Sequence, residues 1–405
     1  MVGPQSSRGA HRLREANRRA ALALLRSHGA LSRADLAREL RISPTTASSV
    51  VADLLAADLV REAPASTQGQ RGRPARLLEL ATPPGVVVGV DIGRRHARVA
   101  VATRDESVLA EEYVPVPAGQ DRERTTRVVQ EYIDVLLERT GHGHADLRAV
   151  GVGLPGPIEH ETNLIATGSI LPEWVGYDIV SVLGEHLRAP VSIDNDANLG
   201  MLGEWRHGAA RGCTDAVYVK VSTGIGSGLL LGGRLHRGAA GTAGELGHTP
   251  IEPEGAVCRC GSRGCLETVA SVPSLLAMLT PTLGEDIALA EVLRLAERGN
   301  RACLRAITDV GRAVGRGLAV MCNILNPAVI VVGGPLVAAG SPFLDGVRDT
   351  VVRSSIPANG NVVDVRPAAL ESRSELVGAL ALAARTAVDR YDVDDHESAS
   401  LSPRR

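Results

Sequence analysis

The chain has 405 residues, 44% of them hydrophobic and 22% charged, which predicts two or three globular domains and excludes a disordered polyelectrolyte. With one Phe, two Trp and five Tyr, it lacks the aromatic side chains for a platform that stacks single-stranded nucleic acid. The formal net charge of −2 divides unevenly: residues 1–80, with 13 Arg and seven acids, carry +6, and residues 81–405 carry −8, so only the N-terminal part is suited to a polyanion.

The N-terminus has no apolar run after its charged residues, so it does not resemble a secretory signal. No stretch reaches the roughly 18 uninterrupted apolar residues of a membrane span. Three of the six cysteines, Cys258, Cys260 and Cys265, lie within eight positions. In a chain without a signal peptide, this clustering indicates metal ligation before disulfides. We therefore expect a cytoplasmic protein with no membrane segment.

Residues 10–82 have the pattern of a winged helix-turn-helix. A first helix is predicted over 17–26 from its apolar spacing. Ser32, with Asp35 three residues later, begins a second helix, and Ser43 before Pro44 begins a third. Strands near 59–60 and 75–80 then enclose a polar loop, the predicted wing.

The third helix and the wing hold the candidate DNA contacts. Short hydroxyl side chains on one helix face suit phosphates and base edges in a major groove. In the wing, a glycine between two arginines resembles a hook for the narrow minor groove. The predicted contacts are Ser43, Thr45, Thr46, Ser48, Ser49, Arg71, Gly72 and Arg73. The alternatives are a loop that is basic by chance and a winged fold that contacts proteins.

Residues 85–391 alternate strands and helices, which indicates α/β layers. A β-branched run at 86–92 is followed by strands at 97–102 and 107–113, a helix near 124–138 and a strand at 149–154. A short strand at 191–193 precedes a further helix. The polar tail, 392–405, is predicted to be disordered.

Seven motifs in this second region occur in one order. They are Asp91-Ile92-Gly93, 151–157 (GVGLPGP), 195–198 (NDAN), 224–228 (GIGSG), 244–248 (GELGH), the cysteine cluster and 331–334 (VVGG). Together they resemble the ROK family of repressors, open reading frames and kinases, and the N-terminal winged helix matches its repressor branch. The resemblance implies an actin-like fold of two α/β lobes, with a sugar in the cleft and, in active kinases, ATP above it.

His248 and the cysteines Cys258, Cys260 and Cys265 supply one imidazole and three thiolates. This is a closed tetrahedral set, typical of structural Zn²⁺. The four ligands match the zinc motif of the family one for one. The alternative is reduced cysteines without a metal.

Sugar contacts follow from the resemblance, which implies that Glu245, His248 and Glu267 face sugar hydroxyls. It also places Gly156, Asn195 and Asp196 at the sugar, Asp196 matching the general base of ROK kinases. Carboxylates and an imidazole suit a polyol, whose hydroxyls both donate and accept. The alternatives are solvated surface carboxylates for Glu245 and Glu267, and a helix N-cap for Asp196.

The phosphate-binding half departs from the family's kinases. Their first phosphate loop reads Asp-Ile-Gly-Gly-Thr-Lys, whereas Arg94, Arg95 and His96 follow Gly93 here. Arginine side chains obstruct a turn shaped around glycine. The glycine-rich segment 223–228 suits either phosphate contact or a tight turn, and Pro335 replaces a glycine of the adenosine side.

The resulting hypothesis is a sugar-responsive regulator, most simply a repressor, that retains a vestigial base in Asp196 and has lost phosphoryl transfer. Half-site geometry predicts that it binds a double-stranded DNA operator as a homodimer or a dimer of dimers. The first alternative is an ATP-dependent sugar kinase with an attached DNA-binding domain. The second is a regulator that senses a partner protein or no ligand.

Overall fold

The computed structural model describes residues 14–400, apart from 15–16, 19, 23, 26–28, 57–58, 64–75, 82–84, 95, 117–120, 160–161 and 166–170; at residue 80 and over 388–400 it describes the backbone alone. The chain divides into two compact units, Met1–Pro84 and Gly85–Arg405. In the described part of the chain, no helix is long and apolar enough to cross a membrane.

The first unit has the predicted winged-helix elements. They are β1 (Leu31–Ser32), α2 (Arg33–Glu39), α3 (Pro44–Ala56), β2 (Val60–Ala63) and β3 (Leu77–Leu80), with the strands antiparallel in the order β1-β3-β2. Ser32 and Asp35 form the predicted capping box at the start of α2. Before α3, the Ser43 hydroxyl accepts the backbone N–H of Thr46 at 3.1 Å. The predicted first helix is described only in part, and the predicted wing contacts Arg71, Gly72 and Arg73 lie outside the described residues.

Helix α3 separates an apolar face from a hydroxyl face, as its sequence predicts. Ala47, Val50, Val51 and Leu54 are buried in a core shared with α2 and β3. Thr45 and Ser48 are exposed on the opposite face. The hydroxyl of Ser49 accepts a hydrogen bond from Arg14 at 2.9 Å, so it is engaged within the unit.

The second unit contains two lobes, each built on a five-stranded sheet. The first lobe comprises β4 (Val86–Ile92), β5 (His96–Thr103), β6 (Val108–Pro115), α4 (Arg122–Arg139), η1 (His144–Asp146), β7 (Leu147–Leu154), β8 (Ile158–Glu159), β9 (Leu164–Ile165), η2 (Pro172–Trp174), α5 (Ile179–Leu187) and β10 (Val191–Asn195).

The second lobe begins with α6 (Asp196–His207), β11 (Ala216–Val221), β12 (Ile225–Leu231), β13 (Arg234–His236), η3 (Leu246–His248), α7 (Leu266–Ala270), α8 (Val272–Leu283), α9 (Leu289–Glu297) and α10 (Arg301–Leu325). It continues with β14 (Val329–Gly333), η4 (Pro335–Ala339), α11 (Ser341–Ser354), α12 (Pro357–Gly360), β15 (Asp364–Pro367), η5 (Glu371–Arg373) and α13 (Ser374–Ser400).

The two sheets share one topology. Their orders are β10-β7-β4-β5-β6 and β13-β12-β11-β14-β15, so each lobe has three consecutive antiparallel strands followed by two parallel ones beside the first. Such a repeated unit is the arrangement expected of an actin-like fold, and the predicted fold class is confirmed. The strand bounds agree with the predicted ones within about two residues.

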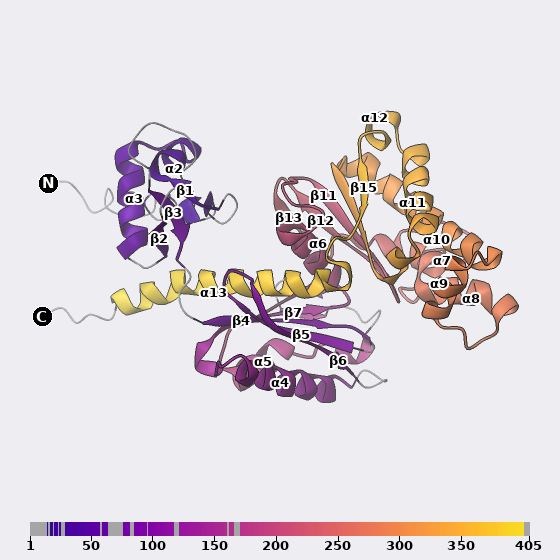
Figure 1. The fold of residues 1–405 in the computed structure, drawn as a ribbon, viewed down its shortest axis with the longest axis horizontal. Coiled ribbons are helices and arrows are strands. Elements are labelled where there is room, and N and C mark those ends of the chain that lie inside the picture. The colour runs from indigo at the N-terminus through magenta and orange to yellow at the C-terminus, as the bar shows by residue number, and fades with distance from the viewer. Residues whose placement is uncertain are drawn as a thin grey trace, which may run out of the picture. The chain divides into compact units, whose positions relative to one another are not determined.

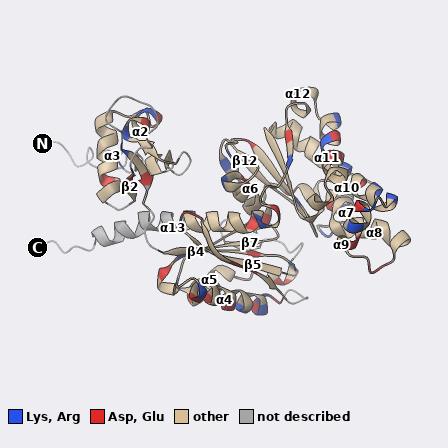
Figure 2. Ribbon diagram, viewed as in Figure 1, with Lys and Arg blue, Asp and Glu red and all other residues tan. Residues whose placement is uncertain are grey.

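Helices cover both faces of these sheets (Figure 1). In the first lobe, α4 and α5 lie on one face of the sheet and α13 lies on the other. In the second lobe, α10 and α11 pack on the outer face and α6 packs against β11 and β12. Charged residues gather on the outer helices and are sparse on the central strands (Figure 2). The central strands β4, β7, β11 and β14 are therefore buried on both faces, which explains their nearly continuous apolar sequence.

Helices α6 and α13 approach each other closely because both contribute glycine. A Cβ on Gly378 would lie 1.9 Å from the Leu199 carbonyl oxygen, and one on Gly203 would lie 2.2 Å from that of Ser374. The fully buried Glu204 carboxylate accepts hydrogen bonds from the backbone N–H groups of 209, 369 and 370 and from the Ser374 hydroxyl, at 2.7–3.1 Å. These hydrogen bonds link the start of α13 to α6.

Helix α13 continues to Ser400, beyond residue 391, where composition predicts the end of the ordered region. Residues 392–400 contain neither glycine nor proline, so nothing in that stretch interrupts helical hydrogen bonding. Residues 401–405 lie outside the described part.

Candidate functional site

The candidate site is a cavity of about 840 Å³ in the second unit, lined by residues of both lobes. Its wall includes all six residues for which sugar contact is predicted, namely Gly156, Asn195, Asp196, Glu245, His248 and Glu267. These residues come from chain segments up to 111 positions apart, and the two-lobed fold brings them together. A cavity of this size is sufficient for a small polar ligand.

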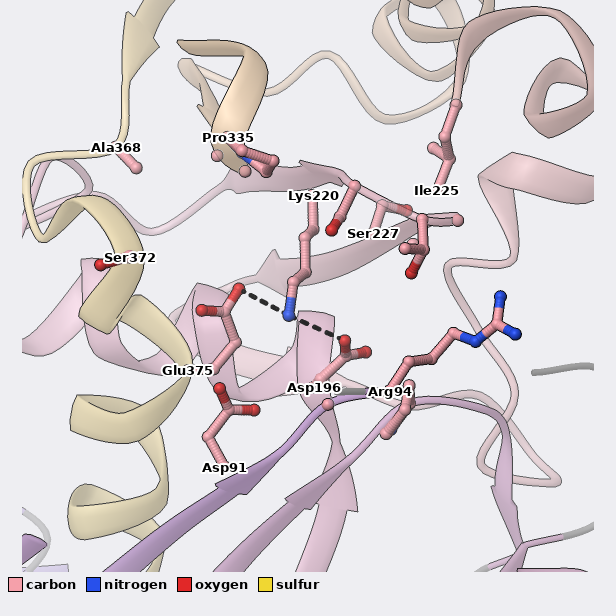
Figure 3. Close-up of a pocket in the computed structure, with 18 of the residues that line it drawn as sticks. Asp91, Arg94, Asp196, Lys220, Ile225, Ser227, Pro335, Ala368, Ser372 and Glu375 are labelled. Carbon is pink, nitrogen blue, oxygen red and sulfur yellow. Dashed lines mark hydrogen bonds and ion pairs between the residues drawn. The ribbon is translucent and has the colours of Figure 1, made fainter. Parts of the chain in front are cut away.

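Asn195 and Asp196 lie where β10 ends and α6 begins. The Asn195 side chain caps the helix by accepting from the N–H groups of Ala197 and Asn198, and it donates to the Gly156 carbonyl at 2.9 Å. The N-cap alternative considered for Asp196 is therefore wrong, because Asn195 occupies that position. As the first residue of α6, Asp196 directs its carboxylate into the cavity (Figure 3).

Lys220, the chain's single lysine, fills the centre of the cleft. Its ammonium donates to Asp196 at 2.9 Å and lies 3.3 Å from the Glu375 carboxylate (Figure 3). Burial lowers the pKa of Lys220, but Asp196, Glu375 and Asp91 together outweigh burial and hold that pKa well above its ordinary value. The ammonium is thus a permanent counter-charge between β11, α6 and α13.

Asp91 and His96 flank the first phosphate-type turn. Burial, together with Glu375 and Asp196, raises the pKa of Asp91 to about 7 although Lys220 opposes the rise. Burial and the charges of Lys220 and Arg98 lower the pKa of His96 to about 4. His96 Nε2 lies 3.9 Å from the Asp91 carboxylate. Because the lowered pKa keeps the His96 imidazole neutral near pH 7, the two side chains do not form an ion pair there.

The turn after Asp91 departs from the kinase sequence, and one of the replacing residues, His96, lies close against Gly93. A Cβ on Gly93 would lie 2.6 Å from the His96 ring, so the imidazole occupies the space beside the turn. The Arg94 side chain extends past Asp196 toward the side of Ile225 (Figure 3). Arg95 lies outside the described residues. The lining of the cavity also includes the carboxylates of Glu371 and Glu375, and Glu375 lies between Lys220 and Asp91 in the view of Figure 3.

The four predicted metal ligands converge at the edge of the cleft. Single ligand atoms of His248, Cys258, Cys260 and Cys265 lie within 4.8 Å of one another, so the four could hold a metal ion. Cys258 Sγ is 3.6 Å from His248 Nδ1, and the Sγ atoms of Cys260 and Cys265 are 3.7 Å apart. His248 Nε2 faces the cavity instead, 3.8 Å from the Glu245 carboxylate.

Glu267 connects the cysteine loop to the glycine-rich strand. One carboxylate oxygen accepts the Ile225 N–H at 3.1 Å, and the other pairs with Arg259 inside the cysteine cluster at 2.9 Å. Its side chain is 7% exposed, which excludes the solvated-surface alternative for this residue. Glu245 is more open, and burial together with the charges of Asp196 and Glu267 raises its pKa to about 7.

Several residues of the site were missed from the sequence. Glu375 does not belong to any of the sequence motifs, yet it lines the cavity and its carboxylate lies 3.3 Å from the Lys220 ammonium. Lys220 had one available signal, since it is the sole lysine among 44 cationic residues. Its ammonium is a compact point charge, unlike the planar guanidinium of the other cationic residues.

The first unit has the fold of a winged-helix DNA-binding domain. The second unit, with two α/β lobes of the same topology around a polar cleft, has the fold of a sugar kinase. Residues 87–386 match the ROK family and residues 16–71 match the MarR family. The chain belongs to the ROK family.

Relatives of the chain include both repressors and kinases. A xylose repressor from Caldicellulosiruptor bescii is 28% identical over 383 residues, 91% of this chain and 96% of the relative. The crystal structure of a ROK transcriptional regulator homologous to E. coli MLC has a TM-score of 0.78 and 23% identity, covering 93% of this chain and 97% of that one. A ROK glucokinase from Streptomyces griseus, in complex with glucose and AMPPNP, has a TM-score of 0.65 and 27% identity, over 74% of this chain and 100% of its own.

Proposed function

We propose that this protein is a sugar-responsive, DNA-binding transcriptional repressor whose kinase-derived domain binds a sugar and does not transfer phosphate. The observation that carries the proposal is the 2.9 Å ion pair between Lys220 and Asp196. Asp196 matches the proton acceptor of the family's kinases, and here one of its oxygens already accepts from an ammonium group. A base engaged in this way can still accept a sugar hydroxyl but is poorly placed to remove its proton.

The sugar side of the cleft supports binding of a neutral polyol. Asn195, Asp196, Glu245 and His248 offer acceptors and donors within one cavity wall. Carboxylates outnumber cationic side chains along the lining, so the potential favours an uncharged or amino sugar over a sugar phosphate.

Zn²⁺ fits the four ligands that organise this wall. Tetrahedral Zn²⁺ with Zn–S near 2.3 Å and Zn–N near 2.0 Å places two sulfurs about 3.8 Å apart and a sulfur and a nitrogen about 3.5 Å apart. The distances of 3.7 Å and 3.6 Å agree with this geometry. His248, Cys258, Cys260 and Cys265 would hold the ion in a closed, structural site. The metal would fix the His248 ring with Nε2 toward the sugar.

The nucleotide side supports the absence of phosphoryl transfer. Transfer from ATP needs a loop that admits phosphate and cations that neutralise it. Here the His96 ring crowds the first turn beside Gly93, and Glu371 and Glu375 add carboxylates to the lining of the cavity. Lys220 is already neutralised by two carboxylates.

The proposed DNA function relies on the first unit and on the relatives. Helix α3 exposes Thr45 and Ser48, and relatives aligned over nearly their full length are named repressors. Pairing two winged helices on half-sites implies a homodimer, or a dimer of dimers. A sugar would alter operator binding only if it has different affinities for the DNA-bound and free conformations of the protein.

A thermal-shift screen against neutral sugars, amino sugars and sugar phosphates tests the proposal, with ATP consumption measured on the same samples. We expect a sugar-dependent rise in Tm that Asp196→Asn and Glu245→Gln abolish, a parallel change in operator affinity, and no ATP turnover. Turnover that depends on Asp196 would instead support the kinase alternative. Intact DNA binding without any sugar shift would support a regulator that senses another partner.

A further inference from the structure

Asp134, His144 and His186 form a second cluster of metal-ligating side chains, in the first lobe and apart from the cleft. Asp134 lies on α4, His144 begins η1, and His186 is in the last turn of α5. We propose that these three residues bind a divalent transition-metal ion, which links α4, η1 and α5. The proposal is independent of the sugar and DNA functions.

The two imidazoles direct equivalent nitrogens to one carboxylate. His144 Nε2 lies 2.8 Å from Asp134 Oδ1, and His186 Nε2 lies 3.0 Å from Asp134 Oδ2. The rings meet edge to face, with centroids 5.6 Å apart and planes inclined by 64°. One ligand atom from each residue lies within 4.8 Å of the other two. Three ligand atoms from three separate elements therefore converge at one point.

Hydrogen bonds outside the cluster keep the elements that carry Asp134, His144 and His186 in place without a metal. One helical turn before Asp134 and His186, the Gln130 amide donates to the Val182 carbonyl at 3.4 Å. Asp134 and His186, each four positions later on its helix, also meet across α4 and α5, so two contacts one turn apart fix these helices against each other. Asp146 closes the η1 turn by accepting the Gly143 N–H at 2.9 Å, which orients the segment that carries His144. Ligands placed on held elements suit metal binding because little ordering remains to be done.

Small movements would convert the hydrogen-bonded cluster into a coordination site. Metal–nitrogen and metal–oxygen distances of about 2.0–2.2 Å separate neighbouring ligand atoms by roughly 3.3 Å. The present nitrogen–oxygen distances are 2.8 and 3.0 Å, so each pair must open by only a few tenths of an ångström.

The ligand set selects a class of ion. Two imidazoles and a carboxylate suit Zn²⁺, Co²⁺ and Ni²⁺ better than Mg²⁺ or Ca²⁺, which prefer oxygen. Three protein ligands leave at least one position to water. The three side chains are 36–41% exposed, so solvent reaches the ion and exchange is rapid compared with the closed Cys₃His cluster.

Co²⁺ is a suitable probe because its visible spectrum distinguishes nitrogen and oxygen ligands from thiolates. The full-length protein is first loaded with one equivalent of Zn²⁺, to fill the Cys₃His cluster, and then titrated with Co²⁺. We expect one equivalent to bind with visible ligand-field bands, without thiolate-to-cobalt charge transfer, and with a rise in Tm. His186→Ala and the conservative His144→Gln should each weaken binding more than about tenfold.

His142→Ala is the matched control, because His142 is two residues from His144 and its ring faces the Thr140 hydroxyl instead of the cluster. This variant should bind Co²⁺ as the wild type does. Equal Co²⁺ affinity in the wild type and His186→Ala would overturn the proposal. The proposal would also be overturned if each variant lowered the Tm, relative to the wild type, by the same amount in Co²⁺ as in chelator. The cluster would then be a hydrogen-bonded crosslink only.

Discussion

Lys220 and Asp196 are 2.9 Å apart in the cleft, and the same ammonium lies 3.3 Å from Glu375. Three elements therefore share one buried counter-charge. In a sugar kinase this region must admit a polyphosphate and its metal ion. Here the Lys220 ammonium, paired with two carboxylates, stabilises the cleft without a bound polyphosphate or metal ion.

Replacing that ammonium should destabilise the second unit. Lys220→Met leaves Asp196 and Glu375 without their counter-charge, and we expect the free energy of unfolding to fall by about 3–5 kcal/mol in urea denaturation. Adding Glu375→Gln should restore part of the loss, because one uncompensated charge is removed. Arg312→Met, which breaks an exposed pair with Asp309, is the control and should change stability by about 0.5 kcal/mol or less. A Lys220→Met protein as stable as the control would contradict the role of the ammonium.

Removing a thiolate should affect both metal content and sugar response. Cys265→Ser leaves an incomplete ligand set, so we expect tightly bound Zn²⁺ to fall from one equivalent to none on dialysis against a chelator that does not strip the ion from the complete Cys₃His set. The loops that carry Glu245 and Glu267 would lose their anchor, so Tm falls and the sugar-dependent shift disappears. Cys213→Ser, outside the cluster, should retain both properties. Metal analysis and thermal-shift measurements on the two variants test this prediction, which fails if Cys265→Ser retains both the Zn²⁺ and the sugar-dependent shift.

Asp91 should make stability fall as pH rises. Its pKa is about 7 in the folded protein against an ordinary value of 3.8, so the folded state binds the extra proton between about pH 4 and pH 7. Stability linked to this proton is present at low pH and is lost as the pH passes through 7. Asp91→Asn should therefore have a larger free energy of unfolding than the wild type at pH 8, by roughly 2 kcal/mol, with a smaller difference at pH 5. Asp309→Asn, on an exposed helix face, should show no such pH-dependent gain.

Operator binding should depend on the exposed face of α3 and on the wing. Thr45→Asp places a carboxylate against the phosphate backbone and should weaken binding at least about tenfold. Arg73→Ala should cost about 1–3 kcal/mol at physiological salt. Arg312→Ala, in the second unit, serves as the control in electrophoretic or fluorescence titrations. Unchanged operator affinity in both Thr45→Asp and Arg73→Ala would argue against DNA binding by the winged helix.

The sequence alone determined those features of the protein that local chemistry dictates. Ser32 with Asp35 predicted a helix start because a capping box needs only neighbouring residues, and the order of the glycine motifs predicted the actin-like fold. The spacing of Cys258, Cys260 and Cys265 predicted metal ligands, and the fold brings one ligand atom of each within 4.8 Å of the others and of His248.

Only the tertiary structure decided which charges meet. Lys220, Asp196 and Glu375 lie on three elements separated by up to 179 positions, and no local pattern relates a β11 lysine to the first turn of α13. The same holds for Asp134, His144 and His186, whose convergence depends on the register of α4 against α5. Electrostatic interactions act through space over a few ångströms, so partners distant in sequence become visible only when the chain is folded.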